Sequence, residues 1–388
     1  MQTVDEQVIW AEINTDAIRH NFRQIKALFD EKVKLIGVIK ANAYGHGAVK
    51  YGQILSQEGA DGLAVARLDE ALELRRNKID LPILILGKVP EIQFTQAIKN
   101  RISITVFDLD YAKRLSELAR RLGETANIHL KIDTGMGRLG FQVKKENVDQ
   151  IPELLKLPNL HLQGIFTHFA TADEKDKSFS HQQADRFEHF LQALAEKDIR
   201  ADYVHCGNSA VIMDLPEYNH QEVRAGIILY GLYPSNQVNK ARLPLRPVMT
   251  LKTRISSIKE LPENSTISYG RTYITKRPSR IAALSVGYAD GYDRSLSNQV
   301  DVLINRQRAP QVGRICMDQI MVDITDLTGD IRPGDEVILF GEHEITADEL
   351  AEKLGTINYE VVCKVNRRVP RVYVNDQGEV EEVVNYLL

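Results

Sequence analysis

The sequence predicts a (β/α)8 TIM barrel followed by a mostly β second domain. Between residues 12 and 235, short apolar runs alternate with amphipathic helical patterns, as expected for parallel strands joined by helices. The alternation gives eight strands, the number that closes such a barrel. Beyond residue 245 the pattern changes to strand-like runs separated by turns, with one clear helix from Ala347. A doubly wound sheet uses the same alternation, and the strand count alone does not exclude it.

The expected elements of the first domain follow in order. Strands are expected at residues 35–39, 62–66, 82–86, 102–107, 128–132, 160–167, 202–205 and 224–230, with helices at 48–58, 68–75, 91–99, 109–122, 148–155 and 180–196. The last helix shows the spacing well, because Phe187, Phe190, Leu191 and Leu194 share one face.

The domain boundary is predicted from a change in composition. Residues 12–235 would form the barrel, and residues 231–247 are rich in Pro, Asn and charge, as in a linker. Residues 245–388 would form the second domain, and residues 1–11 are expected to pack with it. Its strands are expected at 248–258, 280–287, 300–304, 320–324 and 336–340.

Composition limits the partners. A net charge of −4 gives no reason to expect a nucleic acid or an anionic membrane surface as a partner. We find no signal peptide and no apolar stretch of membrane-spanning length. Cys206, Cys316 and Cys363 lie far apart, so we expect neither a metal site nor a disulfide framework. A cytoplasmic protein fits these observations best.

Polar residues that carry chemistry follow the expected strands. In order they are Lys40, Lys131 with Asp133, His168, His205 with Asn208 and Ser209, and Arg224 to Gly226. In a TIM barrel these strand ends meet on one face, where active sites lie. The pattern therefore favours the barrel over the doubly wound sheet.

Lys40 stands at the end of the apolar strand in LIGVIKANAYGHG. A buried amine beside other cations loses its proton more easily than an exposed one, and a neutral amine can form a Schiff base. The alternative is a strand-end lysine that reaches solvent, and this segment alone does not decide between them.

The glycine-rich segment Gly135-Met-Gly137-Arg-Leu-Gly140 matches GxGxxG and follows an expected strand. No amphipathic helix follows at once, and the next strand carries no acidic residue for a ribose hydroxyl. We therefore do not expect a dinucleotide site here.

Several motifs together resemble those of the alanine racemase family, fold-type III enzymes that use pyridoxal 5′-phosphate (PLP). They are VIKANAYGHG, KIDTGMGRLGF, THFATAD, CGNSA, VRAGIILYG, ISYGRTY, SVGYADGY, VGRICMDQIMVDIT and NYE, and they cover essentially the whole chain in order. The resemblance implies a homodimer whose active sites combine one barrel with the β domain of the other subunit.

The resemblance also implies roles for single residues. Lys40 would bind PLP covalently. The phosphate and the rest of the cofactor would be held by Tyr44, Arg138, His205, Asn208, Ser209, Arg224, Gly226, Ile227 and Tyr359. Arg138 would contact the phenolic oxygen of PLP as well as the substrate. Lys131 matches a position that is carbamylated in relatives, the alternative being an ordinary lysine paired with Asp133.

The implied mechanism uses two bases on opposite faces of the substrate. Lys40 would serve one face, and Tyr269 of the partner subunit the other, with Arg224 and His168 supplying positive charge to the tyrosine. Arg224 would also face the pyridine nitrogen of PLP, which it cannot protonate. Met317 would receive the substrate carboxylate, while Tyr288 and Tyr359 would narrow the pocket to a methyl side chain.

Two kinds of alternative stay open. One is another fold-type III PLP enzyme, either a racemase for serine or larger residues or a decarboxylase. The other is a non-catalytic PLP-homeostasis protein, which would resemble the barrel alone. A supply of D-alanine for peptidoglycan is the expected role, although the sequence does not separate it from a catabolic one.

Overall fold

The computed structural model describes residues 6–341 and 344–387 of the 388-residue chain. Its contacts divide the chain into two compact units. One, called here the barrel unit, holds residues 19–43 and 48–245. The other, the β unit, holds residues up to 18, the short segment 44–47 and the residues from 246 onward. No helix within the described residues is both long and apolar enough to span a membrane.

The barrel unit is an eight-stranded parallel sheet in the order β10-β2-β3-β4-β5-β6-β8-β9, with the two-residue β7 (Phe141–Gln142) paired beside β6. The strands are β2 (Lys34–Val38), β3 (Gly62–Val65), β4 (Ile83–Ile85), β5 (Ile102–Val106), β6 (Ala126–Asp133), β8 (Leu160–Phe166), β9 (Tyr203–His205) and β10 (Glu222–Ala225). An isolated bridge between Gly207 and Val223 joins the last two, so the sheet nearly closes. The predicted barrel is confirmed, and the doubly wound alternative is excluded.

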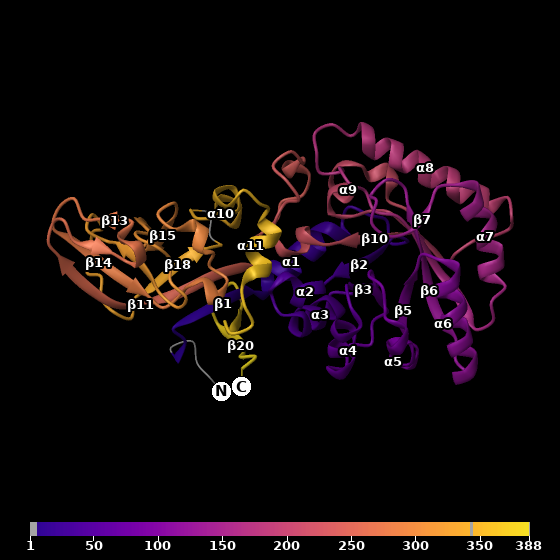
Figure 1. Cartoon of the computed structure of the whole chain (residues 1–388), viewed down its shortest axis with the longest axis horizontal. Coiled ribbons are helices and arrows are strands. Elements are labelled where there is room, and N and C mark those ends of the chain that lie inside the picture. Colours follow the sequence, from indigo (N-terminus) through magenta and orange to yellow (C-terminus); the bar gives the residue numbers. More distant parts are fainter. Residues whose placement is uncertain (1–5, 342–343, 388) are drawn as a thin grey trace. The chain divides into compact units, whose positions relative to one another are not determined.

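Helices surround this sheet, as Figure 1 shows for α3 to α8. They are α3 (Ala48–Gln57), α4 (Leu68–Arg76), α5 (Phe94–Lys99), α6 (Leu109–Leu122), α7 (Lys145–Leu155), α8 (Ser178–Ala195) and α9 (Ser209–Asp214), while α1 (Thr15–Lys26) crosses the boundary between the units in the chain. Asp108 caps α6 by accepting from Tyr111 N–H, and Gly123 ends it in a left-handed conformation. With these caps, α6 spans Leu109–Leu122, the range predicted for this helix.

The last barrel strand differs from the prediction of 224–230. β10 ends at Ala225, and Ile227–Tyr230 form a 3-10 turn that Gly231 ends in a left-handed conformation. All four residues of the turn are buried. A short apolar run is equally compatible with a buried strand and a buried helical turn. The prediction that the strand continues to residue 230 was therefore wrong.

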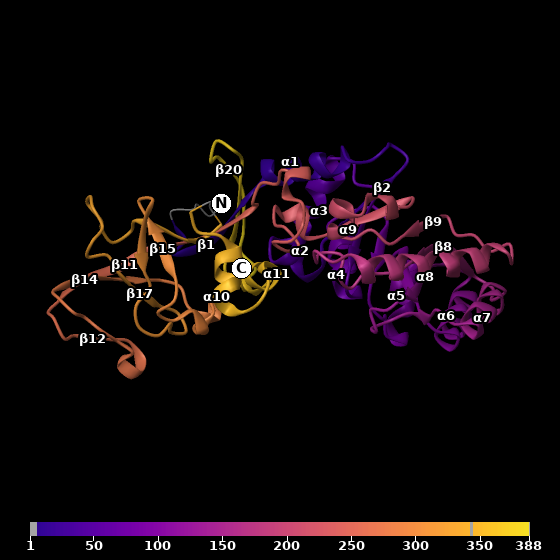
Figure 2. The ribbon, with the colours of Figure 1, turned by 90° about the horizontal axis from the view of Figure 1, so that it is seen from above.

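The β unit is a mixed sheet. Its strands are β1 (Ile9–Asn14), β11 (Met249–Leu261), β14 (Ser279–Leu284), β15 (Asp301–Ile304), β16 (Gln307–Pro310), β17 (Ile320–Asp323), β18 (Glu336–Phe340), β19 (Arg371–Val374) and β20 (Val380–Val384), with the hairpin β12 (Thr266–Ile267) and β13 (Tyr273–Ile274) outside it. The long β11 lies beside β14, which in turn pairs with β17 (Figure 2). The predicted mostly β architecture is confirmed.

Two short helices lie in the β unit where one was expected. The predicted helix from Ala347 is α10 (Ala347–Leu354), begun by Thr346 as N-cap and ended by Gly355. The second, α11 (Asn358–Lys364), was missed. Its sequence NYEVVCK is short and contains two β-branched valines, which lower helix propensity.

Candidate active site

Four basic side chains lie near His168, at or just after the carboxyl ends of the barrel strands. Lys40 follows β2, Lys131 lies in β6, and Arg224 lies in β10. Burial lowers the pKa of His168 well below its usual range, and the charges of Arg224, Lys131, Arg138 and Lys40 lower it further. Since charges act in this way only over short distances, these side chains share one region of the barrel. The fold thus brings together, near these strand ends, residues that lie far apart in the sequence, from Lys40 to Arg224.

The backbone after Lys40 forms a left-handed turn, which was not predicted from the sequence. Ala41, Asn42, Ala43 and Tyr44 have φ values of +52°, +55°, +53° and +49°. For residues other than glycine this conformation costs roughly 1–2 kcal/mol each. Ala43 N–H donates to the carbonyl of Ile39 at 2.9 Å. The surrounding contacts must hold the turn in place.

Glu70, at the start of α4, supplies such contacts. One carboxylate oxygen accepts from Ala41 N–H at 2.6 Å, and the other accepts from Ala66 and Arg67 N–H at 2.8 and 3.1 Å. On the other side of the turn, Asn42 Oδ1 accepts from Ala48 N–H at 2.9 Å. Glu70 therefore ties the end of β3 to the residue that follows Lys40. Sequence analysis missed Glu70, because its only visible signal was an acid in the first turn of a helix.

Arg224 is 3% exposed, and hydrogen bonds to neighbouring barrel residues hold its guanidinium. Its Nη1 donates to His205 Nδ1 at 2.6 Å and to the His205 carbonyl at 3.1 Å. Its Nη2 donates to the carbonyls of Thr167 at 2.9 Å and Cys206 at 3.4 Å. Its Nε makes no hydrogen bond to any described residue. Arg224 makes no hydrogen bond to the His168 ring among the described residues, but its charge lowers the pKa of His168. The role of both residues in supplying charge to Tyr269 stays a prediction.

Lys131 is 4% exposed and does not pair with Asp133 as the alternative supposed. Its Nζ donates to the carbonyl of Ile132 at 3.0 Å and lies 5.2 Å from the centre of the Phe166 ring. Burial, followed by the charge of Arg224, lowers the pKa of Lys131 to about 7, although Asp133 opposes this shift. A substantial fraction of this amine is unprotonated at neutral pH.

The glycine-rich loop after β6 is organised by Asp133. Asp133 Oδ1 accepts from the N–H groups of Gly135 and Gly137 at 3.0 and 3.1 Å. The chain then returns to the edge of β6 as β7, and α7 begins only at Lys145. This loop carries Arg138, whose side chain is exposed.

Several of the predicted cofactor-binding residues lie between β9 and the 3-10 turn after β10. Ser209 Oγ accepts from Gly226 N–H at 3.0 Å and retains its own proton for another acceptor. Asn208 uses its side-chain oxygen to cap α9, accepting from Ala210 and Val211 N–H at 3.0 Å each. Ile227 is buried. The structure gives Asn208 a capping role here.

Two predicted tyrosines meet in the β unit. The ring centres of Tyr44 and Tyr359 lie 6.0 Å apart with an interplanar angle of 51°. Tyr44 is buried, and its segment is held by Arg371 Nε, which donates to the Gly45 carbonyl at 2.8 Å.

The remaining predicted residues, Tyr269, Tyr288 and Met317, lie on loops of the β unit that are bound to one another. Ser268 Oγ donates to the Arg314 carbonyl at 2.6 Å, and the N–H groups of Tyr288 and Ala289 donate to the carbonyls of Cys316 and Met317 at 3.1 and 3.0 Å. The side chains of Tyr269, Tyr288 and Met317 are 70%, 42% and 53% exposed. Three large side chains that a folded chain would normally cover are therefore held at the surface.

Both parts of the chain match known family models. The alanine racemase N-terminal domain matches residues 13–234, and the alanine racemase C-terminal domain matches residues 248–373. The chain belongs to the alanine racemase family. The resemblance that the sequence motifs indicated is confirmed.

Individual alanine racemases are similar over their full length. One from Clostridium novyi is 50% identical over 382 residues, covering 98% of both chains, and alanine racemase 2 of Caldanaerobacter subterraneus subsp. tengcongensis is 52% identical over 379 residues, covering 97% of both. The solved alanine racemase of Clostridium difficile 630 is 50% identical and superimposes over all of both chains with a TM-score of 0.96. The alanine racemase fold is thus shared across both units.

Proposed function

We propose that this chain is a PLP-dependent alanine racemase that interconverts L- and D-alanine. The observation that carries the proposal is the convergence of Lys40, Lys131, Arg138 and Arg224 on His168 at the strand ends. Such a site suits a ligand that carries both a phosphate and a carboxylate. The solved structure of a 38% identical alanine racemase from Bacillus anthracis has L-Ala-P bound, which supports the same substrate class.

The donor groups of the barrel fit PLP. Ser209 Oγ can donate to the phosphate, and Gly226 N–H, which donates to Ser209 Oγ, orients that hydroxyl. The backbone N–H of Ile227 would also donate to the phosphate, and Tyr44 and Tyr359 would add hydroxyls. Arg224 directs its two Nη atoms to the wall, which leaves Nε to donate to the pyridine nitrogen. Arg138 and its neighbour Lys131 would lie toward the phenolic oxygen. Bound PLP would withdraw electrons from the substrate and so make its α-proton acidic.

Inversion then requires one group on each face of the α-carbon. Lys40 would remove or return the α-proton on one face, and Tyr269 of the partner subunit would do so on the other. Arg224 cannot release its proton to the pyridine nitrogen at neutral pH, although burial lowers the pKa of this guanidinium to about 10. The nitrogen would stay unprotonated, which favours prompt return of the proton over side reactions.

The exposed tyrosines and methionine support a homodimer with shared sites. Tyr269, Tyr288 and Met317 lie on loops that hydrogen bonds join, yet between 42% and 70% of the surface of each is exposed. A partner barrel would cover them, with Met317 at the substrate carboxylate and Tyr288 limiting the side chain to a methyl group. Small methylene differences are worth only about 1–3 kcal/mol in such pockets, so slow turnover of serine is expected.

We also infer a carbamate on Lys131. Its pKa of about 7 provides the neutral amine that attacks CO2, and the carbamate would gain a negative charge beside Arg138 and Arg224. This modification would orient Arg138 toward the cofactor.

The role in the cell is inferred to be cytoplasmic supply of D-alanine for peptidoglycan. The chain carries Cys206, Cys316 and Cys363 as thiols, in keeping with a reducing compartment. A decarboxylase or a PLP-homeostasis protein has less support, because the second-domain family model also matches this chain.

Chiral chromatography tests the proposal. Purified protein loaded with PLP should convert L-alanine to an equal mixture with D-alanine, much faster than it converts L-serine or L-lysine. Sedimentation should give a dimer. Binding of PLP without any racemisation of alanine would contradict the proposal and favour the homeostasis protein.

A further inference from the structure

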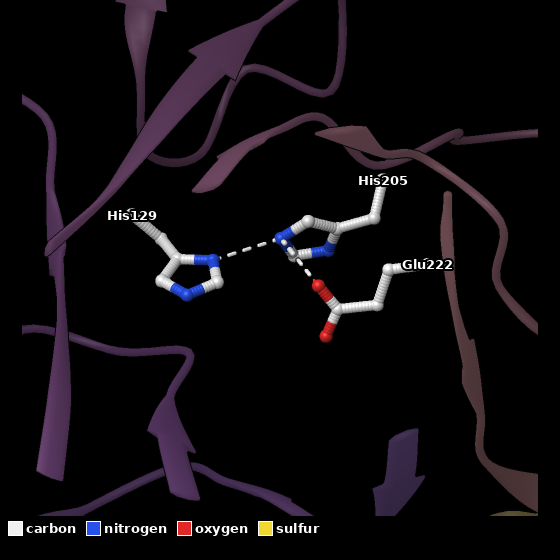
Figure 3. A group of neighbouring side chains, drawn as sticks. All are labelled: His129, His205 and Glu222. Atoms are coloured by element: carbon white, nitrogen blue, oxygen red, sulfur yellow. Dashed lines mark hydrogen bonds and ion pairs between the residues drawn. The ribbon is translucent and has the colours of Figure 1, made fainter. Parts of the chain in front are cut away.

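A chain of buried and partly buried polar side chains extends through the barrel interior from Arg224. His205 Nε2 and His129 Nδ1 lie 2.9 Å apart (Figure 3). His129 Nε2 lies 3.2 Å from Gln163 Oε1. Ser103 Oγ also donates to Gln163 Oε1, at 2.6 Å. His129 and His205 are 3% and 0% exposed. Apolar side chains usually fill this space in such barrels, so a polar chain here calls for an explanation.

The direction of the hydrogen bonds in this chain is fixed. The Arg224 guanidinium can only donate, so His205 Nδ1 accepts and His205 Nε2 carries the proton. His129 Nδ1 must then accept, which places its proton on Nε2, toward Gln163. Burial lowers the pKa of His129 to about 4 and that of His205 well below its usual range, so both rings are neutral at pH 7. Every donor in the histidine chain points away from Arg224.

Glu222 lies beside this chain, at the beginning of β10. Glu222 is 5% exposed, and its Oε2 is buried without a hydrogen-bond partner among the described residues. The same oxygen lies 4.0 Å from His205 Nε2 (Figure 3). Residues 222 and 224 are two apart in one strand, so their side chains leave β10 on the same face. The buried carboxyl of Glu222 thus lies next to His205, which in turn accepts a hydrogen bond from Arg224.

Charged and titratable groups from several neighbouring elements face Glu222. Arg224 on β10 and Lys34 on β2 favour its ionised form, whereas Asp61 before β3 opposes it, and neutral His205 and His129 face it from β9 and β6. Burial is the largest effect and raises the pKa of Glu222 to about 7. The carboxyl therefore changes charge near neutral pH.

Arg224 has one effective counter-charge among the described residues. Burial lowers the pKa of Arg224, and negative charge on Cys206 or Glu222 would raise it again. Burial raises the pKa of Cys206 to about 12, so this thiol is neutral at pH 7. Glu222 alone remains to balance the buried guanidinium.

The same three side chains could in principle bind a metal ion, since ligand atoms of His129, His205 and Glu222 all lie within 4.8 Å of one another. The hydrogen bond from Arg224 argues against this. His205 Nδ1 accepts from the Arg224 guanidinium at 2.6 Å, so it carries no proton. A metal ion on His205 Nε2 would displace the proton there as well, and the ring would have to become an imidazolate. The metal would also lie close to an uncompensated cation.

We propose that Glu222 is a positioning residue that acts through His205 and Arg224, its protonation state setting how much positive charge Arg224 presents to the cofactor. An ionised Glu222 balances the guanidinium and strengthens the histidine chain. A protonated Glu222 leaves the positive potential of Arg224 uncompensated at the strand ends. The consequence at the cofactor rests on the proposed function, whereas the titration of Glu222 does not.

Infrared difference spectra of the purified holoenzyme between about pH 6 and about pH 8.5 test the titration. Glu222→Gln is compared with wild type and with Glu117→Gln, which removes an exposed carboxylate on α6. Wild type and Glu117→Gln should lose the band of a protonated carboxylic acid as pH rises, and Glu222→Gln should lack this change. Glu222→Leu serves as a second variant if the glutamine fails to fold.

The second arm measures the pH dependence of cofactor absorbance and of kcat/KM for alanine. Wild type should show a step that is absent from Glu222→Gln, with at least a ~3-fold difference between the two in the ratio of kcat/KM at high and low pH. Identical spectra and pH profiles in the two proteins would overturn the proposal. Stoichiometric metal that survives dialysis and disappears in Glu222→Gln would also overturn it. A protein that binds no PLP would contradict the proposed function, and the infrared arm would still decide the role of Glu222.

Discussion

The carboxylate of Glu70 accepts a hydrogen bond of 2.6 Å from the backbone N–H of Ala41, the residue directly after Lys40. The same carboxylate accepts from two N–H groups at the end of β3. It thereby anchors the first of four consecutive non-glycine residues that have left-handed backbone conformations. Since Lys40 begins this turn, the position of its amine depends on Glu70.

Replacing Glu70 should therefore impair Lys40 more than overall folding. Glu70→Ala removes three hydrogen bonds to one carboxylate, which is worth about 1–3 kcal/mol of stability after water replaces part of the loss. We expect kcat to fall about 10–100-fold, with slower covalent loading of PLP seen in the absorbance of the bound cofactor. Asp69→Asn, at an exposed neighbouring position, is the control. Normal loading and kcat in Glu70→Ala would show that the turn does not need this clamp.

Ser209→Ala should weaken cofactor binding. The change removes a hydroxyl that accepts from Gly226 N–H and would donate to the phosphate, so the Kd for PLP should rise about 10-fold. Fluorescence titration of the apoprotein measures this. Ser116→Ala, which removes a buried hydroxyl from α6, should alter stability and leave the Kd unchanged. Equal effects of the two changes on the Kd would argue against the phosphate role of Ser209.

Lys131 should take up CO2 in a pH-dependent way. Only its neutral amine reacts, and its pKa is lowered to about 7, so labelling by 13C-bicarbonate should increase as pH rises through this value. A carbamate signal in the NMR spectrum should appear in wild type and in Lys113→Ala, which changes an exposed lysine. Its persistence in Lys131→Ala would place the carbamate elsewhere.

The buried Glu222 also predicts how stability depends on pH. Its folded pKa is raised from 4.5 to about 7, so between these values the folded state binds more protons than the unfolded state. The free energy of unfolding of wild type should therefore fall relative to that of Glu222→Gln as pH rises, by up to ~3 kcal/mol, and the difference should be constant above about pH 7. Denaturant titrations at matched protein concentration measure this. Parallel stability profiles would indicate that Glu222 is ionised throughout.

Much of this could be predicted from the sequence, for physical reasons. Runs such as residues 102–106 are buried on both faces, so their apolar composition marked the barrel strands directly. In a barrel, polar residues at the carboxyl ends of the strands must lie on the same face. The structure does bring Lys40, Lys131, His168 and Arg224 together there.

Other features could not be seen in the sequence. The left-handed turn at Ala41–Tyr44 contains no glycine, the usual sequence signal for positive φ, and includes two alanines instead. Glu70, which is distant in the sequence, helps to stabilise the turn. The histidine chain was missed although a signal existed. Period-two alternation places His129 with Lys131 on one face of β6, and Glu222 with Arg224 on one face of β10.

Mixing two inactive variants tests whether the active sites are shared. In a dimer of one Lys40→Ala and one Tyr269→Phe subunit, one site would have both defects and the other none. Random reassociation of equal amounts should therefore restore about a quarter of wild-type activity. Sites built within single subunits would stay inactive in every mixture.

The most direct test of the two-base account follows hydrogen exchange and stereochemistry together. The PLP-loaded protein is incubated with L-alanine in D2O, and the products are separated by chirality and mass. The account predicts deuterated D-alanine from wild type and none from Lys40→Ala or Tyr269→Phe. Deuterium appearing in L-alanine at the wild-type rate, without inversion, would show that Lys40 acts alone and would contradict the role of Tyr269.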